Sequence, residues 1–99
     1  MSNEWKVTFS NKAAKQLLSL GEVIQLRVRA LVQELIVAGP IRGNWKNYSK
    51  LANNCHHCHI KSGRPTYVCC WQVDQSSGKT QIRIIEIYYI GTHEKAPYY

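Results

Sequence analysis

The second half of the chain collects side chains that could move protons and bind phosphate. His57, His59 and Lys61 stand at alternate positions of a predicted strand, so all three should lie on one face. Arg64 follows in the next turn, and His93 lies near the end of the chain. Imidazole exchanges protons near neutral pH, and Lys or Arg neutralises charge on phosphorus oxygens. The pattern predicts a phosphodiester site, while a plain solvated face is the structural alternative.

The same strand also carries a cysteine motif that could bind a cofactor or a metal. Cys55, Cys58 and His59 spell C-x-x-C-H, the string of covalent c-type haem attachment. Such attachment normally needs an exported chain, and the opening MSNEWKVTFS lacks the basic and apolar regions of a signal peptide. The only methionine, Met1, also leaves no internal axial ligand of that type. We therefore do not expect haem.

Zinc is the stronger alternative for these cysteines. Cys55 and Cys58 with His57 or His59 offer thiolate and imidazole ligands, but a second pair is missing. The adjacent Cys69 and Cys70 would point to opposite faces of a strand. We interpret the cysteines as small, buried apolar residues in a reducing compartment and expect no metal site.

The elements that position these residues follow from apolar periodicity. Trp5, Val7 and Phe9 alternate as in a strand. Ile24 and Leu31 belong to a series at spacings of three and four, which predicts an amphipathic helix. The expected elements are a strand over 4–9, a helix capped by Ser10 or Asn11 and ending before Gly21, a helix over 22–38, and strands over 55–61, 65–73 and 81–90.

This β-α-α-β-β-β order predicts one α+β domain over residues 1–99. Two N-terminal helices should pack on one face of a mainly antiparallel four-stranded sheet. Residues 41–54 show no sustained period and are predicted to be a surface connection, and residues 74–79 a hairpin loop. The ending GTHEKAPYY should leave the sheet.

Composition limits the class of partner. Hydrophobic residues make up 44% and charged residues 19%, which is typical of a folded domain rather than a disordered segment. The formal net charge is +7, which favours polyanions, above all nucleic acid. No apolar run reaches the roughly 20 residues that cross a bilayer, so we expect a cytoplasmic protein without a membrane partner.

Four segments together resemble one known family. They are WKVTFSNKAAKQL, NWKNYSKL, HIKSGRPTYV and the ending GTHEKAPY, which is the most specific. With the β-α-α-β-β-β order, they resemble the RelE/ParE toxin superfamily, and within it the RelE-type, YafQ-like mRNA interferases, over nearly the whole chain.

The resemblance implies a toxin of a type II toxin-antitoxin system. Such a toxin enters the ribosomal A site and cuts mRNA, and a cognate antitoxin, which mainly sets the oligomeric state, holds it inactive. The reaction would need no metal or cofactor, because the 2′-hydroxyl of the substrate attacks the adjacent phosphate. Its products are a 2′,3′-cyclic phosphate and a 5′-hydroxyl.

The same resemblance suggests roles for individual residues. His93 matches the histidine of the family's GTH segment and is the candidate acid or base, and Tyr98 should orient or stack on the nucleotide. Many RelE-like toxins place an arginine where this chain has Val68, which leaves Arg64 as the candidate for phosphate binding. The basic strand that faces the scissile phosphate would be His57, His59 and Lys61. The candidate RNA-binding lysines are Lys46, Lys50 and Lys95.

Two other functions remain alternatives. A ParE-like toxin shares the fold but inhibits DNA gyrase without ribonuclease chemistry, and its expected sequence lacks the histidine row. A non-enzymatic RNA-binding or zinc-binding module is the second alternative. Fold alone does not decide among them, so side-chain chemistry has to.

Overall fold

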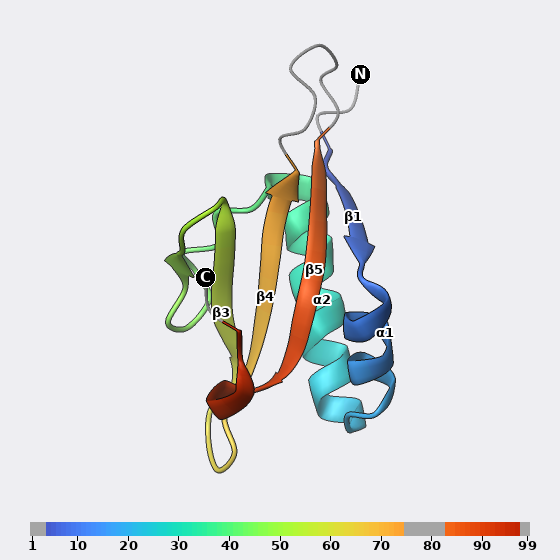
Figure 1. The fold of residues 1–99 in the computed structure, drawn as a ribbon, viewed down its shortest axis with the longest axis vertical. Helices are drawn as coiled ribbons and strands as arrows, with labels where there is room; N and C mark the ends of the chain where they lie inside the picture. Colours follow the sequence, from blue (N-terminus) through green and yellow to red (C-terminus); the bar gives the residue numbers. More distant parts are fainter. Residues whose placement is uncertain (1–3, 75–82, 98–99) are drawn as a thin grey trace.

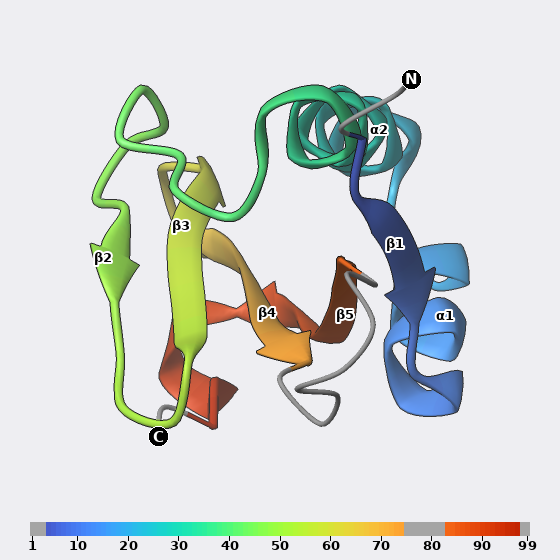
Figure 2. The ribbon, with the colours of Figure 1, turned by 90° about the horizontal axis from the view of Figure 1, so that it is seen from above.

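The protein folds as two helices packed on one face of a five-stranded mixed sheet. A computed structural model describes residues 4–74 and 83–97. The elements are β1 Lys6–Phe9, α1 Asn11–Leu18, α2 Glu22–Ala38, β2 Ser49–Lys50, β3 Cys55–Lys61, β4 Tyr67–Asp74, β5 Ile84–Thr92 and the 3₁₀-helix η1 His93–Lys95. The strand order is β1-β5-β4-β3-β2 (Figure 1). Seen from above, α2 lies over the sheet and α1 lies beside β1 (Figure 2).

The two helices begin and end where their local chemistry predicts. The hydroxyl of Ser10 accepts a 3.0 Å hydrogen bond from the Ala13 N–H and caps α1. Helix α2 ends at Gly39, whose φ of 93° favours glycine. A Cβ there would also lie 2.8 Å from Nε1 of Trp5, so space and backbone both require glycine.

The main core lies between the sheet and the helices. The predicted apolar series of helix α2 reaches the core except for its last member, Ala38, which is exposed. The core residues of α2 and β5 are Ile24, Val28, Leu31, Leu35, Ile85, Ile87 and Ile90. A bulge lies between the Cys70–Tyr89 and Trp71–Ile87 pairs, and it shifts the alternation of β5 by one residue. The side chains of the second, smaller cluster on the far face of the sheet are Val68, Cys70, Tyr88, Tyr89 and Ala96.

The α+β class, the two helices and the helix bounds 22–38 are confirmed. The sheet is mainly antiparallel, as predicted, with one parallel pairing between β1 and β5. The prediction of four strands was wrong, because the two-residue strand Ser49–Lys50 pairs with β3 inside the expected surface connection. Two hydrogen-bonded residues are too few to leave a periodic pattern in the sequence.

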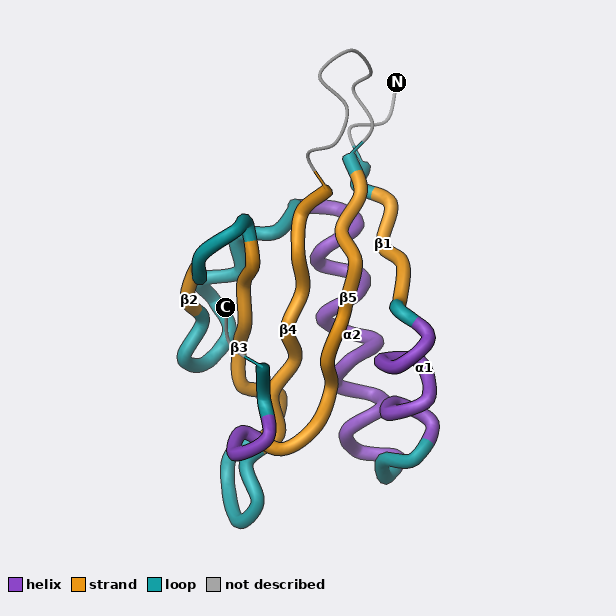
Figure 3. Tube along the Cα trace, viewed as in Figure 1, coloured by secondary structure: helices purple, strands orange, loops and turns teal. Residues whose placement is uncertain are grey.

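The last strand also differs from its prediction. Gly91 and Thr92 still belong to β5, and the chain leaves the sheet only at His93 (Figure 3). Residues 75–82 of the predicted hairpin loop and strand lie outside the described residues. No helix in the described part of the chain is long and apolar enough to span a membrane.

Candidate active site

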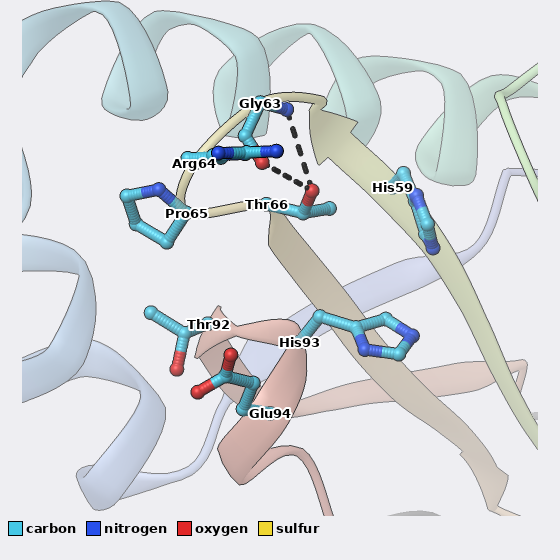
Figure 4. A pocket seen from close by; sticks show the side chains of 8 residues that line it. All are labelled: His59, Gly63, Arg64, Pro65, Thr66, Thr92, His93 and Glu94. Atoms are coloured by element: carbon cyan, nitrogen blue, oxygen red, sulfur yellow. Dashed lines mark hydrogen bonds between the residues drawn. The ribbon is translucent and has the colours of Figure 1, made fainter.

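Three of the predicted phosphodiester residues, His59, Arg64 and His93, line an open cleft of about 620 Å³ at one end of the sheet. The cleft lies between the turn that joins β3 to β4 and the end of β5 (Figure 4). Its lining residues are His59, Gly63, Arg64, Pro65, Thr66, Thr92, His93 and Glu94.

Hydrogen bonds hold the two walls of this cleft together. The Thr66 hydroxyl donates to the Gly63 carbonyl at 2.9 Å and accepts from the Gly63 N–H at 3.3 Å, which closes the turn that carries Arg64 (Figure 4). The His93 N–H donates to the Thr66 carbonyl at 2.9 Å. The turn and the start of η1 are therefore fixed to each other through Thr66.

A buried tyrosine supports the His93 wall from behind. The Tyr89 hydroxyl donates a 2.7 Å hydrogen bond to the carbonyl of Thr92, the residue before His93. Tyr89 is only 5% exposed, and a Cβ on Gly91 would lie 2.7 Å from its hydroxyl oxygen. Glycine at position 91 is thus needed for the tyrosine to reach this carbonyl.

Two imidazoles face each other at the cleft. The ring centroids of His59 and His93 are 5.3 Å apart, with the rings nearly perpendicular at 73°. The ring of His57 is 6.2 Å from that of His59 but does not line the cleft. The geometry therefore favours His59 over His57 as the strand histidine that meets a substrate.

The surroundings of the two outer strand histidines lower the pKa of both rings. Burial lowers the pKa of His59, and the nearby His93 and Lys46 lower it further. Burial also lowers the pKa of His57, with His59 as the next cause. Imidazoles that share a cleft with the guanidinium of Arg64 can exchange protons and bind phosphate oxygens, the two tasks of phosphodiester cleavage.

The predicted row of three basic side chains is broken at its end. A bulge between His59 and Lys61 pairs Lys61 with Tyr67, whose side chain packs on the main core. Lys61 is exposed and does not line the cleft, so the prediction that it shares a face with both histidines was wrong. A bulge adds one residue without changing the local sequence pattern, so the alternation of side chains along the strand cannot reveal it.

The other predicted residues lie around the cleft or outside the described chain. Lys46 is exposed, and its carbonyl accepts a 2.8 Å hydrogen bond from the His59 N–H. Lys50 pairs with His56 across β2 and β3, and Lys95 is exposed on η1. Tyr98 lies outside the described residues. Its role stays a prediction.

Several residues of the site were not predicted. The fold of the backbone places three further residues at the cleft, Thr66, Thr92 and Glu94. In the sequence, only their neighbours Arg64 and His93 indicated a site. The fourth histidine is structural. His56 is buried, and its ring is stacked on Trp71 with the centroids 5.9 Å apart.

The four cysteines are free and buried. Burial raises the pKa of the Cys58 and Cys70 thiols to about 12, and it raises that of Cys69 as well. In the described ranges 4–74 and 83–97, no three His, Cys, Asp or Glu side chains are arranged to hold a metal ion.

This arrangement of helices and strands is that of the RelE-type toxin fold. A mutant of the E. coli toxin RelE in the free state aligns with a TM-score of 0.67 and 16% identity, covering 92% of this chain and 85% of that chain. The intact E. coli RelBE toxin-antitoxin complex aligns with a TM-score of 0.60 and 17% identity, over 89% of this chain and 95% of that one.

An archaeal structure has the same fold. The RelE-RelB complex from Pyrococcus horikoshii OT3 aligns with a TM-score of 0.65 and 14% identity, covering 94% of this chain and 99% of that chain. No model of a protein family and no curated protein matches the sequence. Likeness at these identities establishes the fold, so the function has to be argued from the site.

Proposed function

We propose that this protein is the toxin of a toxin-antitoxin system and that it cleaves mRNA on the ribosome. The observation that carries the proposal is the pair of imidazoles, His59 and His93, which share one cleft with Arg64 on a RelE-type fold. A protein that only binds a partner does not need two histidines in contact at an open cleft. The same pair favours ribonuclease chemistry over gyrase inhibition.

The reaction is an attack of the substrate's own 2′-hydroxyl on the adjacent phosphorus. His93 takes the proton of the hydroxyl, the bond from O2′ to phosphorus forms, and the bond from phosphorus to O5′ breaks. The 5′-oxygen takes a proton from solvent, and His93 later returns its own proton to solvent. The products are a 2′,3′-cyclic phosphate and a 5′-hydroxyl.

His59 and Arg64 face the phosphate in this scheme. The phosphorus oxygens gain negative charge in the transition state, and hydrogen-bond donors placed beforehand stabilise that charge. The turn held by Thr66 keeps Arg64 beside the cleft, so the guanidinium is in place before the substrate arrives. The scheme uses no metal or cofactor.

The partners follow from charge and fold. A net charge of +7 favours ribosomal RNA, which Lys46, Lys50 and Lys95 would contact through phosphates. Two of the similar structures are toxin-antitoxin complexes, which supports an antitoxin as the cellular partner of this protein. An acidic antitoxin segment would complement the basic surface, and we place the toxin in the cytoplasm with its ribosomal target.

The test adds purified protein to a reconstituted translation reaction and maps new mRNA 5′ ends by primer extension, with and without ribosomes. The wild-type protein should cut only when ribosomes are present. His93→Ala should slow cleavage at least about 100-fold, the range expected when a positioned acid-base group is lost. His59→Ala should slow it by a similar factor, about 100-fold or more, because a donor to the charged phosphate oxygens is lost.

A matched control distinguishes a role in the cleft from a general effect of the protein's positive charge. Arg64→Ala and Lys12→Ala each remove one exposed cation, but only Arg64 lines the cleft. Arg64→Ala should slow cleavage and Lys12→Ala should leave it unchanged. Equal rates for the wild type and both histidine variants would contradict the assigned site, and the absence of cleavage by the wild type would contradict the proposed activity.

A further inference from the structure

Three consecutive residues before β3 each contact one histidine of that strand. The shortest contact to each of these histidines involves the same ring nitrogen, Nδ1. The pairs are Asn47 Nδ2 with His59 at 3.2 Å, the Tyr48 hydroxyl with His56 at 2.7 Å, and the Ser49 hydroxyl with His57 at 2.9 Å.

The backbone pairing explains why three consecutive residues each contact a different histidine of β3. Residue 49 pairs with His57 in an antiparallel ladder, and the His59 N–H donates to the Lys46 carbonyl, so this segment runs along the edge of β3. Side chains then alternate between the two faces of the sheet. Tyr48 turns to the buried face and meets His56, whereas Asn47 and Ser49 meet the outer histidines.

The chemistry of the asparagine amide defines the state of His59. An amide nitrogen can only donate a hydrogen bond, so Nδ1 of His59 must accept one. A neutral imidazole that accepts at Nδ1 carries its proton on Nε2. The amide nitrogen also lies 3.5 Å from Nε2, but the shorter approach is to Nδ1.

We propose that Asn47 is a positioning residue that engages Nδ1 of His59 and leaves Nε2 of that ring for the substrate, while Ser49 holds the neighbouring His57. In His59, Asn47 selects the tautomer with the proton on Nε2. This tautomer donates a hydrogen bond to a phosphate oxygen and cannot serve as a base at that nitrogen. The inference rests on the proposed ribonuclease function and deepens it, because it assigns the transfer of protons to His93.

Other groups around His59 also favour its neutral form, as Asn47 does. Positive charge at Lys46 or His93 disfavours a proton on His59, and burial does so too. Protonation of His59 would turn Nδ1 into a donor that faces the Asn47 amide. Among the described residues, the titratable and charged groups around the ring are Arg27 from α2, Lys46 from the segment before β2, His57 from β3, Arg64 from the turn, and His93 and Glu94 from η1.

Two substitutions of Asn47 isolate the amide from the backbone. Its φ of 53° is in the left-handed region, which glycine, asparagine and aspartate tolerate better than alanine does. Asn47→Gly removes the amide, and Asn47→Asp replaces the donor with a carboxylate that accepts. Tyr48→Phe is the matched control, because it removes a bond to Nδ1 of the buried His56 from the neighbouring position.

The experiment records the ¹⁵N chemical shifts of the histidine ring nitrogens by NMR across a pH titration of each full-length variant. We expect the wild-type His59 to carry its proton on Nε2. Asn47→Asp should move the proton to Nδ1 and raise the pKa of His59 relative to the wild type. Tyr48→Phe should leave both properties of His59 unchanged. A wild-type His59 protonated on Nδ1, or an unchanged titration in Asn47→Asp, would overturn the inference.

Cleavage kinetics give the second readout. Asn47→Gly should lower kcat by roughly 10- to 100-fold, because the imidazole of His59 would no longer be held in the orientation that the reaction needs. KM should stay within about twofold. Asn47→Asp should lower kcat most at pH values above the raised pKa of His59, where the neutral ring carries its proton on Nδ1 and Nε2 can no longer donate to the phosphate. A purely structural role would lower thermal stability in all three variants without moving the pH profile, and that result would also refute the inference. The NMR measurement does not depend on activity, so failure of the proposed function is distinguishable from failure of the positioning role.

Discussion

Gly91 provides a quantitative test of how the sheet supports the cleft. A Cβ at this position would lie 2.7 Å from the hydroxyl oxygen of Tyr89 and 2.9 Å from its Cζ, closer than real Cβ contacts. Tyr89 is buried, so it cannot swing into solvent to make room. Gly91→Ala must therefore displace the ring and break its hydrogen bond to the Thr92 carbonyl.

The expected cost has two parts. Overpacking of a filled site costs about 1–3 kcal/mol, and loss of the hydrogen bond costs about 0.5–1.5 kcal/mol. The free energy of unfolding of Gly91→Ala should fall by about 2–4 kcal/mol, which lowers the Tm of a domain of this size by on the order of 10–25 °C. Because Thr92 precedes His93, cleavage should also slow at temperatures where the variant is still folded.

The assay is thermal and urea unfolding of four proteins in a double-mutant cycle. Tyr89→Phe alone removes the hydroxyl, which is the nearest atom to the new methyl group. Gly91→Ala combined with Tyr89→Phe should therefore be more stable than the sum of the single effects by about 0.5–1 kcal/mol. A Gly91→Ala protein as stable as the wild type, or strictly additive effects, would refute the packing argument.

Three further predictions concern stability and reactivity. Burial lowers the pKa of all three β3 imidazoles below the usual 6.5, so the unfolded chain binds protons more readily just below that pH. The free energy of unfolding should keep its full value above the usual pKa of 6.5. It should fall as the pH drops from 6.5 to the lowered pKa values of the folded protein, which urea titrations at about pH 7.5 and about pH 5.5 would detect. Cys58 and Cys70, whose pKa is raised to about 12, should resist iodoacetamide until the protein is unfolded, as mass spectrometry would show. Ser10→Ala should cost about 0.5–2 kcal/mol of stability in the same urea assay and leave cleavage unchanged, because it removes only the cap of α1.

The sequence was sufficient where a pattern repeats over several turns or alternations. The apolar residues of the 17-residue helix α2 recur at spacings of three and four, and the predicted bounds of the helix match the structure. Ser10 or Asn11 was predicted as the cap of α1 because short polar side chains precede the helix, and Ser10 is the cap. These features depend on local periodicity and local hydrogen bonds, which the sequence carries directly.

Features that depend on pairing between distant segments were missed. β2 has only two residues and exists because the backbone at Ser49 pairs with His57. The bulges at His59/Lys61 and at Cys70/Trp71 each shift alternation by one residue, and no residue type marks them. The contact of His59 with His93 joins positions 34 residues apart along the chain, so only the fold could show which of the predicted histidines meet.

The central claim is that the cleft cleaves mRNA by using the 2′-hydroxyl of the substrate. The most direct measurement places a single 2′-deoxynucleotide at a mapped cleavage site of an mRNA bound to the ribosome and compares its cleavage with that of the all-ribose message. We expect the ribose message to yield products with a 5′-hydroxyl end and a 2′,3′-cyclic phosphate, and we expect no cut at the deoxy position. Equal cleavage of the two messages would contradict the central claim.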